Sequence, residues 1–308
     1  MTRAALIGLG TMGPGIAATL ARAGMAVSCY DVSGAARDNA LTQIAAADDV
    51  LTRLDMPDRS NGAKVDIGES LAACVDGADL VIENVPENLE IKASLFRELG
   101  SLVSADCVVA SDTSGIPISA LQKNISAPGR VVGMHWSNPP HIIPIIEVIA
   151  GDETSEGTVT WMVQTIKQLG LKPVVVKKDV PGFVENRVLY ALMRECVDLV
   201  DQGVIDAEAL DTCVSWGIGY KLSVIGPMAL LDVAGLDIYQ AVGSYLNKDL
   251  SARADVSDYV SAKTDQGKLG MKTGGGIYDY TPDRIATLRA ERAAKLVAVR
   301  KILDSQGP

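Results

Sequence analysis

The stretch Ala4-Ala5-Leu6-Ile7-Gly8-Leu9-Gly10-Thr11-Met12-Gly13 places three glycines between a short apolar run and an alanine-rich segment. The apolar run predicts a buried strand, and the alanine-rich segment predicts the helix that follows it. Each glycine then has a physical purpose. Gly8 allows the tight turn, Gly10 lets the backbone approach a pyrophosphate without a Cβ in the way, and Gly13 lets helix and strand pack closely. A glycine turn that serves packing alone is the alternative to a nucleotide site.

A carboxylate at the end of the next apolar run favours the nucleotide site. That run, Ala26–Tyr30, leads directly into Asp31, 21 residues after Gly10. A carboxylate in this place accepts hydrogen bonds from an adenosine ribose and repels a 2′-phosphate. The pattern therefore predicts NAD, rather than NADP, as the cofactor, with Thr11 and Met12 in the binding loop.

Short apolar runs continue to alternate with helical stretches as far as residue 180. The runs are Ala4–Ile7, Ala26–Tyr30, Asp79–Ile82, Cys107–Ala110, Val131–Met134, Ile145–Ile149 and Pro173–Val176. Strands of this length, bounded by Gly, Asp or Pro, are typical of a parallel sheet covered by helices on both faces. We therefore expect a Rossmann-type, mostly parallel α/β domain over residues 1–180.

A second domain is expected because 308 residues exceed what one hydrophobic core usually serves. After Val180-Pro181-Gly182 the apolar spacing becomes helical, so residues 181–308 are expected to form an all-α C-terminal domain. Apolar stretches in it, such as Ile225–Val233, indicate that this domain forms a homodimer contact as well as part of the substrate site. The Arg and Lys residues of the last helical stretch are expected to form a solvated face.

The composition excludes several classes of protein. Of all residues, 48% are hydrophobic and 21% are charged, which is typical of a globular chain rather than a disordered one. The formal net charge of −10 would repel a nucleic acid, and no apolar run approaches the roughly 18 residues of a membrane span. The five cysteines are scattered, without zinc or disulfide spacing. We therefore expect buried thiols, no bound metal, and a cytoplasmic protein without an export signal.

Only two histidines occur, His135 and His141, and both lie in one short segment. Twelve residues after the first, Glu147 interrupts an apolar run in which a buried carboxylate costs several kcal/mol unless it is paired. In a His135–Glu147 pair the carboxylate would orient the ring and raise its pKa, and the other ring nitrogen would accept a substrate hydroxyl proton. A histidine with a structural role in a loop is the alternative.

Six segments occur in the order found in one family of dehydrogenases. They are Gly8–Gly13, Glu83–Lys92, Ser111–Ser114, His135–Glu147, Pro181–Arg187 and Gly270–Tyr278. Through them the chain resembles the short-chain L-3-hydroxyacyl-CoA dehydrogenase family over essentially its whole length. The resemblance implies an NAD-dependent oxidoreductase that removes a proton from its substrate and passes a hydride to the nicotinamide.

Carried over to this sequence, the family's pattern implies a role for each matching residue. His135 would be the general base and Glu147 its partner. Ser114 and Asn186 would contact the reacting oxygen or hold the nicotinamide, and Asn138 would support the base within the cofactor-binding set. For two of these residues the sequence also allows a purely structural role. The Ser114 hydroxyl could cap a helix, and Asn186 could be polar surface.

Glu87 and Lys92 resemble the family's nucleotide-contacting pair beside the nicotinamide ribose. They lie five residues apart in a polar stretch. A solvated charge pair with no ligand is the alternative for them.

Departures from the family's pattern bear on the substrate. The segment 32–78, which in acyl-CoA members carries lysines for the CoA phosphates, has eight acidic and four basic residues here, a net charge of −4. The family's usual Asn is replaced by Asp112, its aromatic pair after the histidine by Trp136-Ser137, and an apolar position by Glu185. A small anionic substrate without CoA is therefore expected, with a flat ring lying on Trp136.

Two further segments, His135–Pro144 and Val214–Lys221, resemble one branch of the family. That branch oxidises the hydrated aldehyde of a small pyridine carboxylate in bacterial vitamin B6 degradation. Two alternatives remain, a short-chain L-3-hydroxyacyl-CoA dehydrogenase and a relative that binds NAD without turnover.

Overall fold

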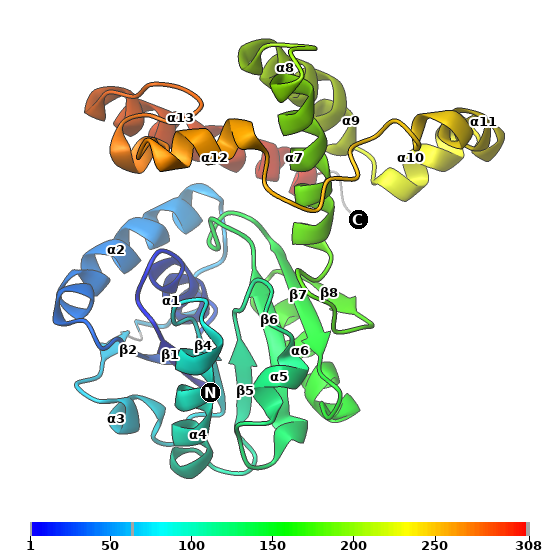
Figure 1. Cartoon of the computed structure of the whole chain (residues 1–308). Coiled ribbons are helices and arrows are strands. Elements are labelled where there is room, and N and C mark those ends of the chain that lie inside the picture. Colours follow the sequence, from blue (N-terminus) through cyan, green and yellow to red (C-terminus); the bar gives the residue numbers. More distant parts are fainter. Residues whose placement is uncertain (1, 63–64, 306–308) are drawn as a thin grey trace. The chain divides into compact units, whose positions relative to one another are not determined.

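The seven apolar runs and one further short strand form an eight-stranded sheet in the computed structural model, which describes residues 2–62 and 65–305 (Figure 1). The strands are β1 (Arg3–Ile7), β2 (Ala26–Tyr30), β3 (Asp66–Ile67), β4 (Leu80–Glu83), β5 (Val108–Ser111), β6 (Val131–Trp136), β7 (Ile145–Ala150) and β8 (Lys172–Val176). Their spatial order is β3-β2-β1-β4-β5-β6-β7-β8. Every described pairing is parallel except β6 with β7, which is antiparallel. The predicted Rossmann-type, mostly parallel sheet is confirmed.

Helices cover both faces of this sheet because successive strand residues point to opposite sides. On one face, Leu6 and Ile82 pack against α1 (Gly13–Arg22), α2 (Gly34–Arg53) and α6 (Glu156–Gln168). On the other, Val81 and Val109 pack against α3 (Leu71–Val75), α4 (Leu89–Leu102) and α5 (Ile118–Gln122). The strands are therefore buried on both sides, as their continuous apolar runs predict.

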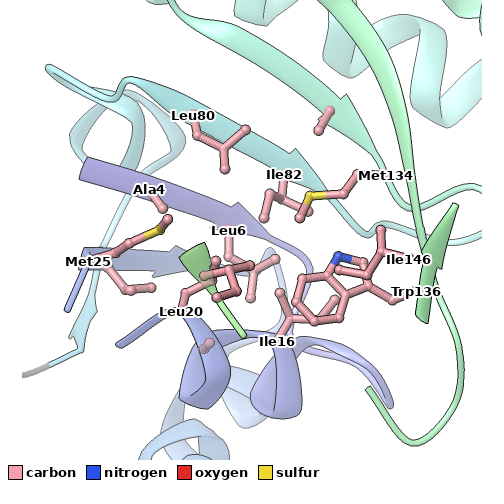
Figure 2. Close-up of a cluster of buried hydrophobic side chains, with 14 of the residues drawn as sticks. Ala4, Leu6, Ile16, Leu20, Met25, Leu80, Ile82, Met134, Trp136 and Ile146 are labelled. Carbon is pink, nitrogen blue, oxygen red and sulfur yellow. The ribbon is translucent and has the colours of Figure 1, made fainter. Parts of the chain in front are cut away.

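Trp136 belongs to the first of these two cores. Its side chain is only 2% exposed, and Figure 2 shows the indole among hydrophobic side chains that include Ile16 and Ile146. The prediction that a flat substrate ring lies on Trp136 is wrong. Since neighbouring side chains of a strand point to opposite faces, a site that uses His135 cannot also use the residue that follows it.

The chain divides into two compact units, and the first is not continuous in sequence. One unit comprises the residues up to Asn186 together with those from Ala293 onward, and the other is Arg187–Arg292. The second unit contains only helices, as predicted. These helices are α7 (Glu185–Asp201), α8 (Ala207–Cys213), a π-helical turn (Val214–Gly219), α9 (Tyr220–Leu222), α10 (Pro227–Ala234), α11 (Leu236–Leu246), α12 (Asp258–Asp265), a 3₁₀ turn (Met271–Thr273) and the first part of α13 (Pro282–Ser305).

The end of α13 differs from the expected single C-terminal domain, because it packs on the sheet unit. Leu296 and Val297 lie against a small apolar cluster of that unit, which contains Val50, Leu54 and Ile142. The cluster keeps these apolar side chains out of water, and this explains why the helix end belongs to the first unit.

Arg300 corrects the expectation that the basic residues of the last helix are all solvated. Its side chain is 5% exposed, and Nη1 donates a hydrogen bond to the Ile142 carbonyl oxygen at 2.8 Å. The neighbouring Lys301 pairs with Asp55 at 2.7 Å. Basic side chains therefore fasten the helix end to the first unit.

The second unit contains a buried polar network but no buried hydrophobic side chain among its residues, all of which the structure describes. Asp198 accepts a hydrogen bond from the Ser251 hydroxyl and pairs with Arg253 at 3.1 Å. Large apolar side chains such as Trp216 and Met228 are instead more than two thirds exposed. No single described helix is long and apolar enough to cross a membrane. By length and composition the segments Ala207–Leu222 and Pro227–Ala234 could do so only as a pair, which is bent by 87°.

Candidate active site

The glycine loop between β1 and α1 has the geometry that its sequence predicts. Gly8 has a φ of +106°, and a Cβ placed on it would lie 2.2 Å from the Asn84 carbonyl oxygen. A Cβ on Gly13 would lie 2.4 Å from the Gly8 carbonyl oxygen. A Cβ on Gly10 would meet no atom within 4 Å. Gly8 and Gly13 are thus required by the protein's own packing, whereas Gly10 borders open space in which a ligand can approach the backbone.

The start of α1 is suited to an anion. Met12 precedes the first helical residue, and no side chain accepts a hydrogen bond from the helix's first N–H groups. Unsatisfied N–H groups and the positive end of the helix dipole favour a negatively charged group at this position. The exposed Thr11 lies in the same loop. These residues fit the pyrophosphate of a dinucleotide.

Asp31 lies directly after β2, and its carboxylate is fixed by the backbone. Oδ2 accepts a hydrogen bond from the Leu9 N–H at 2.7 Å, and Oδ1 accepts one from the Ser33 N–H at 2.8 Å. The carboxylate therefore links the glycine loop to the end of β2, and it retains lone pairs for a ribose diol. Arg37 was not predicted to be near this position. Its guanidinium donates to the Asp31 carbonyl oxygen and lies 5.7 Å from the centre of the Tyr30 ring.

His135 and Glu147 form the predicted pair. They occupy facing positions of β6 and β7, and Nδ1 of the imidazole lies 2.8 Å from Oε2 of the carboxylate. The other carboxylate oxygen accepts hydrogen bonds from the N–H groups of Val184 and Glu185, at 3.0 and 3.1 Å. Because an ionised carboxylate only accepts, Nδ1 carries the hydrogen and Nε2 keeps its lone pair for a substrate proton.

Charges around the pair determine its proton affinity. Burial by itself lowers the pKa of His135, but the hydrogen bond to Glu147 and the negative charges of Asp112, Glu147 and Glu185 outweigh it, so the pKa is raised. Burial raises the pKa of Glu147, and the hydrogen bonds from His135, Glu185 and Val184 more than offset this, so that pKa is lowered. The carboxylate therefore stays ionised while the imidazole exchanges protons.

Asp112 is a buried acid that sequence reasoning noticed only as a departure from the family's pattern. Its Oδ1 accepts a hydrogen bond from the Trp136 N–H at 2.8 Å, which fixes the end of β6 next to His135. Burial raises the pKa of Asp112 to about 7, although this hydrogen bond and the nearby imidazole lower it. A buried carboxyl group that can titrate near neutral pH thus interacts electrostatically with the candidate base.

One group of side chains has the composition of a metal site. Ligand-type atoms of His135, Glu147 and Glu185 lie within 4.8 Å of one another. Each carboxylate already accepts hydrogen bonds from protein groups, since the Ser137 hydroxyl donates to Glu185 and three donors surround Glu147. The pair is satisfied without an ion. The expectation of no bound metal stays a prediction.

Ser114 and Asn186 are brought together, as their predicted shared role requires. The Asn186 Nδ2 donates a hydrogen bond to the Ser114 carbonyl oxygen at 3.0 Å. Ser114 is exposed in the turn after β5, and the cap position of α5 is taken by Pro117, so Ser114 is not a helix cap. Asn138 lies in the loop directly after β6, two residues beyond Trp136. Their roles toward a substrate or cofactor stay predictions.

Glu87 and Lys92 are not a solvated pair. Lys92 is 1% exposed, and its Nζ donates to Oε1 of the buried Glu83 at 2.6 Å and to the Val85 carbonyl oxygen at 3.2 Å. Its distance to Glu87 Oε2 is 3.4 Å. Protein groups thus surround the ammonium, and the contact of Lys92 with a nucleotide stays a prediction.

Glu87 itself is partly exposed and ties two strand ends together. Its Oε1 accepts hydrogen bonds from the Thr113 hydroxyl at 2.6 Å and from the N–H groups of Ser114 and Gly115 at 3.1 Å each. Burial by itself raises the pKa of Glu87. The Thr113 hydroxyl, the Lys92 charge and the Gly115 N–H outweigh burial, so the pKa is lowered. The carboxylate is therefore ionised and holds the turn that carries Ser114.

Glu83 is the member of this group that sequence reasoning missed. It is completely buried, and besides Lys92 it accepts hydrogen bonds from the Ser111 hydroxyl at 2.6 Å and the Val85 N–H at 2.8 Å. The sequence does indicate a role for Glu83, because an acid at the end of the apolar run Leu80–Glu83 needs a partner when it is buried, for the same reason as Glu147.

All these groups gather at one edge of the sheet. The glycine loop, Asp31, the turn with Ser114 and the His135 segment follow the carboxyl ends of β1, β2, β5 and β6. Open parallel sheets bind their ligands at this edge, between β1 and β4, where the strand order reverses. A dinucleotide loop beside a histidine with a carboxylate partner defines a nicotinamide-nucleotide-dependent dehydrogenase.

Comparison with known proteins identifies the family. Residues 3–180 match the model of the 3-hydroxyacyl-CoA dehydrogenase NAD-binding domain, and residues 182–280 match that of the 3-hydroxyacyl-CoA dehydrogenase C-terminal domain. The chain belongs to the 3-hydroxyacyl-CoA dehydrogenase family, and it is an NAD-dependent oxidoreductase. The predicted family, cofactor and enzyme class are confirmed. The two family models meet at Pro181, and α13 lies outside both of them.

The relatives fall into two groups by their activity. A protein of Mesorhizobium japonicum named 5-formyl-3-hydroxy-2-methylpyridine 4-carboxylate 5-dehydrogenase is 60% identical over 98% of both chains. A crystal structure of an enzyme with this activity, described as an NAD⁺-dependent dismutase, has a TM-score of 0.96, 60% identity and 99% coverage of both chains. (S)-3-hydroxybutyryl-CoA dehydrogenase from Ralstonia eutropha has a TM-score of 0.74 and 31% identity, covering 91% of this chain and 99% of its own.

Proposed function

We propose that this protein oxidises 5-formyl-3-hydroxy-2-methylpyridine 4-carboxylate to the corresponding dicarboxylate with NAD⁺, a step of vitamin B6 degradation. The observation that carries the proposal is the His135–Glu147 pair, buried at the nucleotide edge of a chain that is 60% identical to an enzyme with this activity. The charges around the pair and the acidic segment 32–78 support a small polar substrate rather than a thioester.

The chemistry proceeds from the hydrated aldehyde, in which one carbon bears two hydroxyl groups and a hydrogen. His135 Nε2 takes the proton of one hydroxyl group, the C–H bond breaks, and its electron pair leaves with the hydrogen as hydride. NAD⁺ supplies the hydride acceptor when it is bound. The carbon becomes a carboxyl group, and Glu147 stabilises the imidazolium that forms.

The same residues serve the reverse transfer. Protonated His135 can return its proton to an aldehyde oxygen, and a hydride from the NADH formed in the oxidation would add to the carbon, which gives an alcohol and regenerates NAD⁺. A chain that performs both half-reactions dismutes its substrate, as the description of its 60% identical relative states for that protein. We extend our proposal to this second activity.

The charge of the segment 32–78 favours this substrate over an acyl-CoA. The segment has eight acidic and four basic residues, a net charge of −4, and a CoA phosphate group would be repelled by it. Only part of this charge is compensated locally, by the Arg22–Asp48 pair at 2.8 Å and the Lys301–Asp55 pair. The 31% identical thioester enzyme makes short-chain 3-hydroxyacyl-CoA the second candidate substrate.

A side-by-side substrate comparison tests the proposal. The purified enzyme is assayed by NADH absorbance with NAD⁺ and the pyridine aldehyde, and in parallel with acetoacetyl-CoA and NADH, while His135→Gln serves as the control for background oxidation. We expect the aldehyde to be turned over and the thioester to be nearly inert. Thioester turnover with a kcat/KM of roughly 10⁵ M⁻¹s⁻¹ or more, together with an inert aldehyde, would replace the first proposal by the second.

We also propose that the protein is a homodimer held together by its helical unit. Exposed apolar side chains on α10 and around it, such as Met228 and Val233, support this, because a soluble protein rarely leaves such a surface uncovered. Val233→Asp should shift the mass measured by light scattering from two chains to one. An unchanged mass would place the dimer contact elsewhere, and a wild-type mass of one chain would contradict the dimer.

The cysteines support a reducing compartment, which we propose is the cytoplasm. All five are free thiols. Burial raises the pKa of Cys74 and of Cys107 to about 11, so these two stay protonated and unreactive. The expectation that every cysteine is buried is corrected, since Cys196 is partly exposed and Cys213 is exposed.

A further inference from the structure

Ser137 and Glu185 come from distant parts of the sequence and contact each other next to the His135–Glu147 pair. The Ser137 hydroxyl, which is buried directly after β6, donates a hydrogen bond to Oε2 of Glu185 at the first position of α7. A buried hydroxyl and a half-buried carboxylate satisfy each other here.

Glu185 is linked to the pair in a second way, through its backbone. The Glu185 N–H donates to Oε1 of Glu147 at 3.1 Å, beside the parallel bond from Val184 at 3.0 Å. The opposite oxygen of Glu147 contacts His135. A continuous path of hydrogen bonds therefore runs from Ser137 through Glu185 and Glu147 to the imidazole.

Three carboxylates face the imidazole from three elements. Glu147 lies on β7, Asp112 follows β5, and Glu185 begins α7, and all three favour the charged imidazole. The remaining ring neighbour is Phe183, with 5.7 Å between the ring centres. The buried Glu83–Lys92 pair acts on Asp112 with opposite signs, since Glu83 raises the pKa of that acid and Lys92 lowers it. The carboxylates of Glu147, Asp112 and Glu185 therefore all act on the imidazole in the same direction.

We propose that Glu185, held in place by Ser137, is a positioning residue that adds a negative charge next to the His135–Glu147 pair and fixes the orientation of Glu147. The charge of Glu185 stabilises the imidazolium that proton transfer creates, and its backbone N–H keeps Glu147 aimed at Nδ1. Such a base holds its proton more firmly than one without the Glu185 charge, which suits an enzyme that both takes and returns a proton. This use of the charge rests on the proposed function.

The decisive measurement needs no substrate, because the chain has only two histidines. Imidazole signals of His135 and His141 are titrated by NMR and assigned with His141→Gln. Glu185→Gln keeps the size of the side chain and removes its charge, and it should lower the pKa of His135 by about 0.5 to 1 unit. Ser137→Ala should lower it by less, since the carboxylate remains but is no longer held.

Glu156→Gln is the matched control. Glu156 is also the first residue of a helix, α6, and it is exposed, so the same chemical change there should leave the His135 titration unmoved. Thermal unfolding of each variant shows whether it is folded. A His135 pKa that changes by less than about 0.2 unit in folded Glu185→Gln would overturn the proposal, as would an equal shift in the control.

The pH profile of turnover gives the second readout. In Glu185→Gln the acidic limb of kcat/KM for aldehyde oxidation should move to lower pH by the same amount as the titration, with kcat at high pH reduced less than tenfold. A purely structural loss would lower kcat equally at every pH and leave the limb in place. If wild type does not oxidise the aldehyde, the proposed function fails, while the NMR titration still decides the role of Glu185.

Discussion

His135 and Glu147 stand directly opposite each other on β6 and β7, in the antiparallel pairing of an otherwise parallel sheet. Cross-strand neighbours of this kind have their Cβ atoms about 5 Å apart, so the two side chains meet without any contribution from a flexible loop. The imidazole is therefore oriented by the same backbone hydrogen bonds that build the sheet. A rigid platform of this type keeps a general base in place through repeated proton transfers.

His135→Gln should lower kcat by about 100- to 10,000-fold, because an amide matches the imidazole in size but cannot accept a proton near neutral pH. The dissociation constant of NAD⁺, measured by calorimetry, should change little. His141→Gln is the matched control. Burial and the nearby Arg53 charge lower the pKa of His141, so it stays neutral, and its loss should leave kcat nearly unchanged. A large loss of kcat in His141→Gln together with a nearly unchanged kcat in His135→Gln would show that His141 is the general base.

The acidic limb of aldehyde oxidation should lie above pH 6.5, the ordinary pKa of histidine. His135 must be neutral to accept a proton, so its raised pKa makes oxidation fail as the pH drops through that value, while reduction gains. Glu147→Gln removes the carboxylate charge and replaces the charged hydrogen bond, which raises the pKa most, by at best a neutral one, so it should move the limb to lower pH, with kcat about 10- to 100-fold lower. An unmoved limb in this variant would show that His135 is not the titrating base.

Asp112→Asn should stabilise the protein at pH 8. Burial raises the folded-state pKa of Asp112 to about 7 from 3.8, so between these pH values the folded state binds a proton that the unfolded state has lost. The free energy of unfolding therefore falls as the pH rises through this window. Asparagine keeps the acceptor for the Trp136 N–H without the charge. We expect a gain of about 1 to 3 kcal/mol at pH 8 in urea unfolding, and a smaller one at pH 5. A pH-independent difference would contradict this account.

Gly10→Ala and Gly13→Ala should separate ligand binding from folding. The added Cβ at Gly10 meets no protein atom within 4 Å, so the free energy of unfolding should change by less than about 1 kcal/mol, while NAD⁺ binding weakens at least about tenfold. At Gly13 the Cβ would lie 2.4 Å from a backbone oxygen, and we expect a destabilisation of about 1 to 3 kcal/mol. Equal loss of stability in both variants would remove the reason for assigning Gly10 to the ligand.

Asp31→Asn should narrow the preference for NAD⁺ over NADP⁺ by about tenfold in kcat/KM. The amide keeps an oxygen acceptor for one of the two N–H groups that Asp31 holds, but it no longer repels a 2′-phosphate. The adjacent Arg37 is then available to that phosphate. Arg37→Gln in the Asp31→Asn background should reverse the gain with NADP⁺. If NADP⁺ matched NAD⁺ already in the wild type, the role of Asp31 would be refuted.

The sequence contained enough to predict the sheet, the glycine loop and the His135–Glu147 pair, because each follows from local patterns or from the cost of an unpaired buried acid. The reversed direction of β7 was also encoded, since the eight residues between Trp136 and Ile145 are too few for a parallel crossover. The inward orientation of Trp136 follows from strand alternation once His135 is assigned to the site. The direction of β7 and the orientation of Trp136 are therefore both predictable from the sequence.

Other features could not be read from the sequence. Neither the contact of Ser137 with Glu185 nor the burial of Arg300 has a local signature, because the partners lie 48 residues apart in one case and 158 in the other. The two-residue strand β3 is too short to produce an apolar run. Long-range polar contacts of this kind depend on the whole fold, and only coordinates show them.

The return of α13 to the sheet unit has a consequence for the order of events during synthesis. Val50, Leu54 and Ile142 are made early, but Leu296 and Val297, which cover them, follow only after all of Arg187–Arg292. At typical rates of translation the apolar cluster stays uncovered for roughly 8 to 30 s after Ile142 is made. The nucleotide-binding unit is thus synthesised first, but its apolar cluster is covered last. A nascent chain that stalls within the helical unit therefore exposes these apolar side chains to chaperones.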